Sequence, residues 1–227
     1  MFKHLENGDS EPKVDRSKLI FYIFQFCPFS RRVALTLSHH GIEHDRIYIN
    51  IKKKPDWFIT INPTGKVPMI EQEGEKLLDS EMICRYLDQL IETDNLIRAS
   101  DENSIKFVNE WWANIFKSFH AIAFQKEFSE DQKETFLKAL EDFEKIPGTG
   151  FITGDNVGLA DFLVYPIMEL IDICLTRLKQ PPIIGNISFR RTNLWFQRMN
   201  ELPAVQKERI PEEIHREYMK TILEIPI

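Results

Sequence analysis

Hydrophobic positions in the first 90 residues follow three patterns in turn. A continuous apolar run at 19–24 predicts a short buried strand. Beyond Pro28, apolar residues recur at helical spacing until Gly41, which predicts a helix with a glycine stop. Isoleucines at 47, 49 and 51 then alternate with polar residues, as in a second strand. This order predicts a parallel strand pair joined by a right-handed helical crossover.

A hairpin and a further helix are predicted to follow. The stretch "NPTGKVPMI" leads from a loop into a strand, "QEGE" is typical of a hairpin turn, and "KLLD" is the returning strand. Ser80 then has the side chain and the position of a helix N-cap. The first 90 residues are therefore expected to form βαβ, a connection, and then ββα.

Every strong pattern after residue 100 is helical. Five apolar residues share one helical face: Ile105, Val108, Trp112, Ile115 and Phe119. The stretch "SEDQ" matches a capping box, and "LADFLVYPIMELIDI" predicts a central buried helix perturbed near Pro166. We expect a polar N-terminal extension (1–18), an α/β unit (19–92), a linker (93–100) and an all-helical unit (101–227).

Composition and charge narrow the possible functions. The chain of 227 residues is 43% hydrophobic, enough for an ordinary globular core, and its net charge of −6 argues against nucleic-acid binding. No apolar stretch approaches the ~20 residues of a membrane span, and no signal-peptide pattern is present. Three widely spaced cysteines match neither a disulfide framework nor a metal site, so we expect no metal and a reducing, cytoplasmic location.

Cys27 stands where the first strand gives way to the first helix, directly before Pro28. A helix N-terminus offers unpaired N–H groups and a partial positive charge, and both stabilise a thiolate. Arg31 and Arg32 add positive charge in the next turn. The pattern predicts a reactive cysteine with a depressed pKa. The alternative, a small buried hydrophobe, suits the other two cysteines better.

Ser30 occupies the place that a second cysteine holds in a Cys-x-x-Cys redox motif. No neighbouring thiol can therefore displace a partner from a mixed disulfide on Cys27. Exchange with an abundant small thiol is the natural route.

At this point the motifs point to a family. "FCPFSRR", "KKPDWF", "NPTGKVP" and "LLDSEMICRYLD" follow one another at spacings that closely resemble omega-class cytosolic glutathione transferases. The later stretch "GDNVGLADFLVYP" resembles their second domain, and the resemblance spans about 19–202. It implies the cytosolic glutathione transferase fold: a thioredoxin-like α/β N-terminal domain plus an all-α C-terminal domain. It also implies glutathione as co-substrate and a homodimer.

The resemblance implies a glutathione site on the first domain. Val67–Pro68 looks like the family's cis-proline turn, whose backbone would pair with the cysteinyl unit. Lys54 would pair with the glycyl carboxylate. Ser80, at a helix N-terminus, would take the γ-glutamyl carboxylate, and Asp79, commonly Glu in the family, the ammonium group. Phe29 would pack against the ligand or seal the helix start.

An open acceptor site between the domains is implied as well. Trp111 is a candidate because Trp112 continues the core face of its helix. A tryptophan common near the end of omega enzymes has no evident match, and His215 and Tyr218 lie in that region.

The stretch "GDNVGLAD" departs from the family at one position. Gly158 stands where Ser or Thr is the usual N-cap, a change that costs only about a few tenths of a kcal/mol. We expect the motif to survive and Asp161 to be structural.

The activities that the resemblance implies are glutathione-dependent thiol transfer and dehydroascorbate reduction, with Cys27 forming a mixed disulfide with glutathione. Two alternatives stay open. The same fold and motif resemble soluble intracellular chloride-channel proteins, although the charged residues after Cys27 make membrane insertion costly. A conventional conjugating transferase would need another residue to activate glutathione; Tyr22 is the only tyrosine in the first strand, and Ser30 lies one turn too deep.

Overall fold

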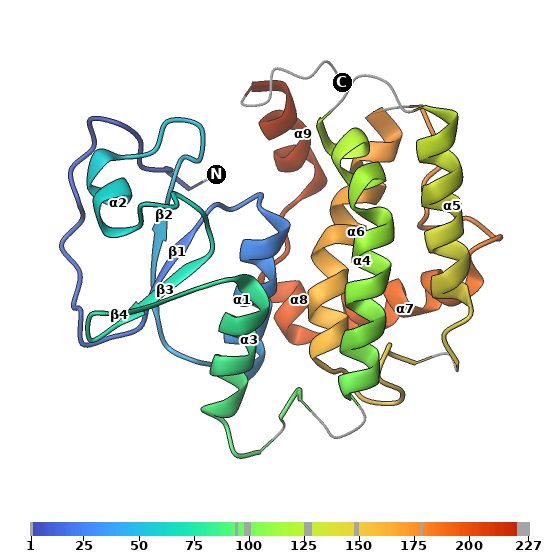
Figure 1. Ribbon diagram of the computed structural model, residues 1–227, viewed down its shortest axis with the longest axis horizontal. Helices are drawn as coiled ribbons and strands as arrows, with labels where there is room; N and C mark the ends of the chain where they lie inside the picture. Colours follow the sequence, from blue (N-terminus) through green and yellow to red (C-terminus); the bar gives the residue numbers. More distant parts are fainter. Residues whose placement is uncertain are drawn as a thin grey trace. The chain divides into compact units, whose positions relative to one another are not determined.

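The computed structural model describes residues 2–93, 95–97, 101–124, 129–147, 150–177 and 179–221 (Figure 1). The chain divides into two compact units, Met1–Asp94 and Asn95–Ile227. Half of the linker predicted at 93–100 lies outside the described residues, as do the last six residues of the predicted helical unit.

The first unit is built on a four-stranded sheet in the order β2-β1-β3-β4. Its strands are β1 (Ile20–Ile23), β2 (Asp45–Tyr48), β3 (Met69–Gln72) and β4 (Glu75–Leu78). β2 runs parallel to β1, while β3 is antiparallel to both β1 and β4. The predicted strand–helix–strand unit and the hairpin are therefore confirmed.

Three helices cover this sheet: α1 (Pro28–His40), α2 (Asp56–Ile61) and α3 (Ser80–Gln89). α1 and α3 pack together on one side of the sheet, and α2 lies on the other (Figure 1). Strand β1 is buried along its whole length, because both faces of the sheet are covered. Gly41 ends α1 as predicted, with a φ of 63° that glycine adopts without steric cost.

The polar N-terminal extension is fastened to the edge of the sheet. Leu5 forms an isolated parallel bridge with Ile49. Its N–H donates to the Tyr48 carbonyl at 2.8 Å, and its own carbonyl accepts from Asn50 N–H at 2.8 Å. These bonds pair the backbone groups at the end of the β2 edge, at Tyr48 and Asn50.

The described part of the second unit is helical. Its helices are α4 (Asp101–Phe124), α5 (Glu130–Glu144), α6 (Leu159–Arg177), α7 (Arg190–Glu201), α8 (Pro203–Lys207) and α9 (Glu212–Thr221). α4 packs against both α5 and α6 (Figure 1). The capping box at Ser129 and Gln132 is confirmed, and so is the buried helix that contains Pro166. None of the described helices is long and apolar enough to cross a membrane.

Trp111 and Trp112 exchange the roles that the sequence predicts. Trp111 is only 3% exposed, and its indole N–H donates to the Ala139 carbonyl of α5 at 3.2 Å. Trp112 is half-buried and contacts Phe116 edge-on. Both positions continue the face marked by Val108, at i+3 and i+4. The structure favours Trp111 because α4 is covered by α5 as well as by α6, which widens its buried face.

Asp161 fastens the loop before α6 to α6 and α7. Its Oδ1 accepts from Ile152 N–H at 2.7 Å and from the Trp195 indole N–H at 2.8 Å. Its Oδ2 accepts from Gly158 N–H at 3.0 Å and from the Thr153 hydroxyl at 3.2 Å. Burial raises the pKa of Asp161 to about 6, although these bonds act in the opposite direction.

Gly158 is required by its neighbour Thr153. A Cβ atom at position 158 would lie 2.5 Å from Thr153 Cγ2 and 2.8 Å from its Oγ1. The threonine cannot step aside easily, because a β-branched side chain has few rotamers and its hydroxyl also lies 2.8 Å from the Asn156 carbonyl oxygen. The threonine side chain fills the space that a serine cap would need.

We therefore expect Gly158→Ser to destabilise the protein, although it restores the usual cap. Overpacking should lower the free energy of unfolding by about 1–3 kcal/mol, measured by urea titration. In a Thr153→Ala background the same substitution should be neutral or stabilising, because the space is then open. An equal loss in both backgrounds would contradict this explanation.

Candidate functional site

The pairing of three strands brings the predicted site residues to one edge of the sheet. Tyr22 of β1 faces Met69 of β3, and Leu78 of β4 faces Met69 from the other side. The chain that follows β1, the chain that precedes β3 and the chain that follows β4 therefore meet. These segments carry Cys27, Val67–Pro68 and Asp79–Ser80 respectively.

Cys27 is the N-cap of α1 and lies beside the turn before β3. Its backbone is extended, and Pro28 occupies the first helical turn, as predicted. The Val67–Pro68 peptide bond is cis, which confirms the prediction from the motif. The Cys27 sulfur lies 4.0 Å from the Val67 carbonyl oxygen, to which the thiol donates a weak hydrogen bond. The residue is partly exposed.

The prediction of a depressed pKa for Cys27 is wrong. Burial of the sulfur among protein atoms is the largest effect, and it raises the pKa of the thiol. The N–H groups of Phe29 and Ser30, the Ser30 hydroxyl and the charge of Arg32 act in the lowering direction without offsetting burial. The helix N-terminus and the arginines can be predicted from the sequence, whereas the burial of the sulfur depends on tertiary packing and cannot.

Arg32 joins α1 to α3 behind the cysteine. Its side chain is buried, and its Nη1 donates to the Ser80 hydroxyl at 3.2 Å. Its guanidinium carbon lies 4.9 Å from the centre of the Phe29 ring. Burial lowers the pKa of Arg32 to about 10, so the group still carries its charge at neutral pH. The sequence predicts this charge but not the bond to Ser80, which requires the packing of α1 on α3.

The N-terminus of α3 is capped by Asp79, not by Ser80 as predicted. Asp79 Oδ1 accepts from the N–H groups of Glu81 at 3.0 Å and Met82 at 3.1 Å. Its φ of 78° lies in a region that residues other than glycine seldom occupy, and such strain clusters at functional sites. Ser80 is the first helical residue and is buried. Aspartate and serine are both good caps, so the local pattern alone did not decide between them.

Lys54 is half-buried and packs on the loop that leads to the cis-proline turn. A Cβ atom at Gly65 would lie 3.1 Å from Lys54 Cδ, so the glycine allows the lysine stem to approach the backbone. Lys52 and Lys53, in contrast, are exposed. The two motifs "KKPDWF" and "NPTGKVP" thus contact one another through this lysine.

The predicted acceptor residues belong to the second unit. His215 and Tyr218 are buried on α9, 2% and 6% exposed, and Trp111 is buried against α5. The acceptor site between the domains stays a prediction. Among the described residues, no group of three His, Cys, Asp or Glu side chains could hold a metal ion.

Comparisons with known proteins agree with this arrangement. Two family models match the chain: the glutathione S-transferase N-terminal domain over residues 21–94 and the C-terminal domain over residues 106–207. Pyrimidodiazepine synthase of Drosophila melanogaster is 30% identical, over 96% of this chain and 92% of its own length. Glutathione S-transferase omega-1 of Rattus norvegicus is 27% identical, over 98% and 93%. Among solved structures, the dehydroascorbate reductase of Chlamydomonas reinhardtii superposes with a TM-score of 0.71 at 19% identity, over 92% of this chain and all of that one.

The alkylation rate of Cys27 should still be rising at the pH where an ordinary thiol, with a pKa of ~8.5, is half ionised. The reason is that only the thiolate reacts and burial disfavours it. The rate is measured with iodoacetamide against pH, and the Cys27→Ala protein supplies the background from Cys84 and Cys174. A midpoint clearly below ~8.5 would mean that the helix N-terminus and Arg32 prevail over burial.

Proposed function

Because the chain belongs to the glutathione S-transferase family, we propose that it is a glutathione-dependent thiol transferase and dehydroascorbate reductase of the omega type. The family and the fold inferred from the sequence motifs are confirmed by the two family models and the omega-1 relative. The observation that carries the proposed chemistry is the partly exposed Cys27 at the start of α1, beside the cis-proline turn.

Thiol transfer would proceed in two exchanges at Cys27. The Cys27 thiolate attacks the glutathione sulfur of a mixed disulfide, forms a bond to that sulfur, and releases the substrate thiolate, which is then protonated. A second glutathione thiolate attacks the same glutathione sulfur, giving glutathione disulfide and returning the Cys27 thiolate. Ser30 supplies no competing thiol, and Cys84 and Cys174 are 0% and 1% exposed.

Dehydroascorbate reduction would use the same cysteine. The Cys27 thiolate adds to a carbonyl carbon of the substrate, and a glutathione thiolate then attacks the Cys27 sulfur. The electron pair of the carbon–sulfur bond passes to the substrate, which is protonated to ascorbate, and a second glutathione resolves the mixed disulfide. One structural neighbour is named as a dehydroascorbate reductase, and one relative is named for the synthesis of a pyrimidodiazepine. We therefore assign one kind of glutathione chemistry to Cys27, and more than one acceptor substrate fits it.

Glutathione would be held by the residues that meet at the sheet edge. The Val67 backbone would pair with the cysteinyl unit and so place the glutathione sulfur beside Cys27. Ser80 accepts its hydrogen bond from Arg32 and can donate its own proton to the γ-glutamyl carboxylate, with the Arg32 charge behind it.

The two ends of the tripeptide would meet opposite charges. Both cap bonds of Asp79 end on Oδ1, so Oδ2 keeps its lone pairs for the γ-glutamyl ammonium. Lys54 would pair with the glycyl carboxylate. Phe29 is partly exposed beside Cys27 and would cover the ligand from the α1 side.

The structure disfavours a conjugating transferase that relies on Tyr22. This side chain is fully buried, its hydroxyl donates to Glu71 at 2.9 Å, and burial raises the pKa of Tyr22 further. A membrane-inserting role is disfavoured by Arg31 and Arg32, which the first turns of α1 hold buried.

We also propose a homodimer in the cytoplasm. α3 and its C-cap residue expose Met82, Tyr86 and Leu90, which are 56%, 38% and 51% exposed and lie four residues apart, on one stripe. An exposed apolar stripe of this kind is typical of an interaction surface, and the mass of the protein in solution tests the assembly. None of the three cysteines forms a disulfide, which suits a reducing compartment.

Cys27→Ser should lose nearly all thiol-transferase and dehydroascorbate reductase activity, because a hydroxyl is hardly ionised at neutral pH and forms no disulfide. Intact-mass analysis after treatment with oxidised glutathione should find one glutathionyl group, on Cys27. The matched control is Cys84→Ala with Cys174→Ala, which should keep both the activity and the adduct. Wild-type activity in Cys27→Ser, or an adduct on another cysteine, would refute the proposed chemistry.

Lys54→Ala and Ser80→Ala should each raise the KM for glutathione about ten-fold with a smaller effect on kcat, because each removes a charge-assisted contact. Lys53→Ala is the control for Lys54, since it removes the same charge from an exposed neighbour. If all three variants show the same glutathione dependence as the wild type, the assigned binding residues are wrong.

A further inference from the structure

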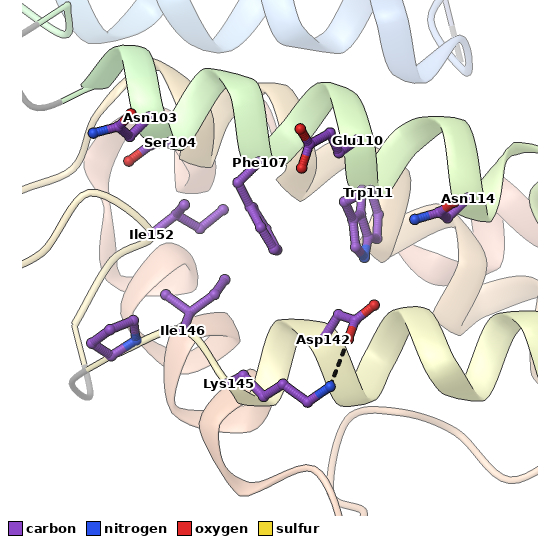
Figure 2. Close-up of a pocket in the computed structure, with 11 residues that line it drawn as sticks. Asn103, Ser104, Phe107, Glu110, Trp111, Asn114, Asp142, Lys145, Ile146 and Ile152 are labelled. Carbon is purple, nitrogen blue, oxygen red and sulfur yellow. Dashed lines mark hydrogen bonds and ion pairs between the residues drawn. The ribbon is translucent and has the colours of Figure 1, made fainter.

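A pocket of about 480 Å³ lies between α4 and α5 in the second unit (Figure 2). Residues of both helices line it, together with Ile146, Pro147 and Ile152 from the segment that follows α5. Pockets of this volume hold small organic molecules in other proteins. The residues assigned above to glutathione all belong to the first unit, whereas those that line this pocket all belong to the second.

Aromatic and aliphatic side chains form the walls of this pocket. Phe107 and Trp111 project from α4, with Ile146 and Ile152 beside them (Figure 2). The Trp111 ring is held in place, because it is buried and its N–H donates to Ala139. Phe107 contacts the ring of Phe143 edge-on, at 6.5 Å between centroids. The pocket therefore offers the partly exposed ring of Phe107 for a flat molecule to stack on, while the buried Trp111 supplies wall and no free ring face.

The charges around this pocket leave a negative excess. Its lining contains two carboxylates, Glu110 and Asp142, and one amine, Lys145. Lys145 and Asp142 neutralise each other at 2.7 Å, as the dashed line in Figure 2 marks. Glu110 is 66% exposed and has Lys106 only at 3.9 Å, the outer limit of an ion pair between exposed side chains. The remaining polar groups, Asn103, Ser104 and Asn114, are uncharged.

We propose that this pocket binds a planar aromatic cation. The rings of such a molecule would stack on Phe107. Its positive charge would be attracted to the face of the Phe107 ring and to the Glu110 carboxylate. An uncharged ring of the same shape gains only the stacking, and an anionic one is repelled by Glu110. The proposal is independent of the chemistry at Cys27.

Proflavine and acridine separate charge from shape, because they share one planar ring system and only proflavine is protonated at mildly alkaline pH. Dissociation constants are measured by calorimetry with the full-length protein. Proflavine should bind about five-fold more tightly than acridine at low salt, with the difference shrinking at high salt. Phe107→Ala should weaken both ligands at least about three-fold. Equal affinities, or proflavine binding that Phe107→Ala leaves unchanged, would overturn the proposal.

Three charge variants test the sign of the effect. Glu110→Gln should weaken proflavine about three-fold without changing acridine, and Lys145→Gln should tighten proflavine, because it unmasks Asp142. Glu102→Gln removes the same charge from α4 at a residue that does not line the pocket, and it should change neither ligand. Glu110 is exposed, so its substitution leaves the fold intact. If Glu110→Gln and Glu102→Gln behave alike, only the net charge of the protein matters and the assigned site is wrong.

Discussion

The candidate glutathione site depends on the register in which β3 pairs with β1 and β4. Met69 lies between Tyr22 and Leu78, and this places the chain before β3 next to the chains that leave the other two strands. A slip by one residue would move the Val67 carbonyl about 3.3 Å along the sheet, comparable to its 4.0 Å separation from the Cys27 sulfur. A buried polar contact holds this register, because the Tyr22 hydroxyl of β1 donates to the Glu71 carboxylate of β3 at 2.9 Å and a slip would break the bond.

Local patterns in the sequence were sufficient for the fold of the first unit. The apolar run at 19–24, the alternation at 47–51 and the helix with its glycine stop each report on contacts close in sequence. The first strand and the helix lie where predicted, whereas the second strand is Asp45–Tyr48 and ends before Ile49 and Ile51. Features that depend on packing between elements could not be predicted from these local patterns. Trp111 and Trp112 differ only in which of them meets α5, and the Arg32–Ser80 bond exists only because α1 lies against α3. The sequence identified the motifs that carry the site, whereas tertiary packing sets the roles within each motif.

Thr153 and Gly158 show how a departure from a family pattern can be compensated nearby. The capping rule treats position 158 by itself and assigns a small cost to glycine. In the structure the threonine hydroxyl donates to Asp161, the acceptor of the loop's other donors, and its side chain occupies the volume of the missing cap. The two residues are five apart and meet only because the loop turns back on itself. The effect of either residue on the free energy of unfolding therefore depends on the other, which is why a rule for a single position fails here.

The raised pKa of Cys27 slows both of the exchanges proposed at this sulfur, for different reasons. In the first exchange few molecules carry the Cys27 thiolate at neutral pH, and the greater nucleophilicity of a thiolate of higher pKa offsets this loss only in part. In the second exchange Cys27 is the leaving group, and a sulfur of high pKa leaves slowly. Arg32 and the N–H groups at the start of α1 favour the departing thiolate, but burial outweighs them. The scarcity of the thiolate therefore slows the first exchange and the basicity of the leaving sulfur slows the second, so the ratio of reduced Cys27 to its mixed disulfide during turnover reports which of the two effects is larger.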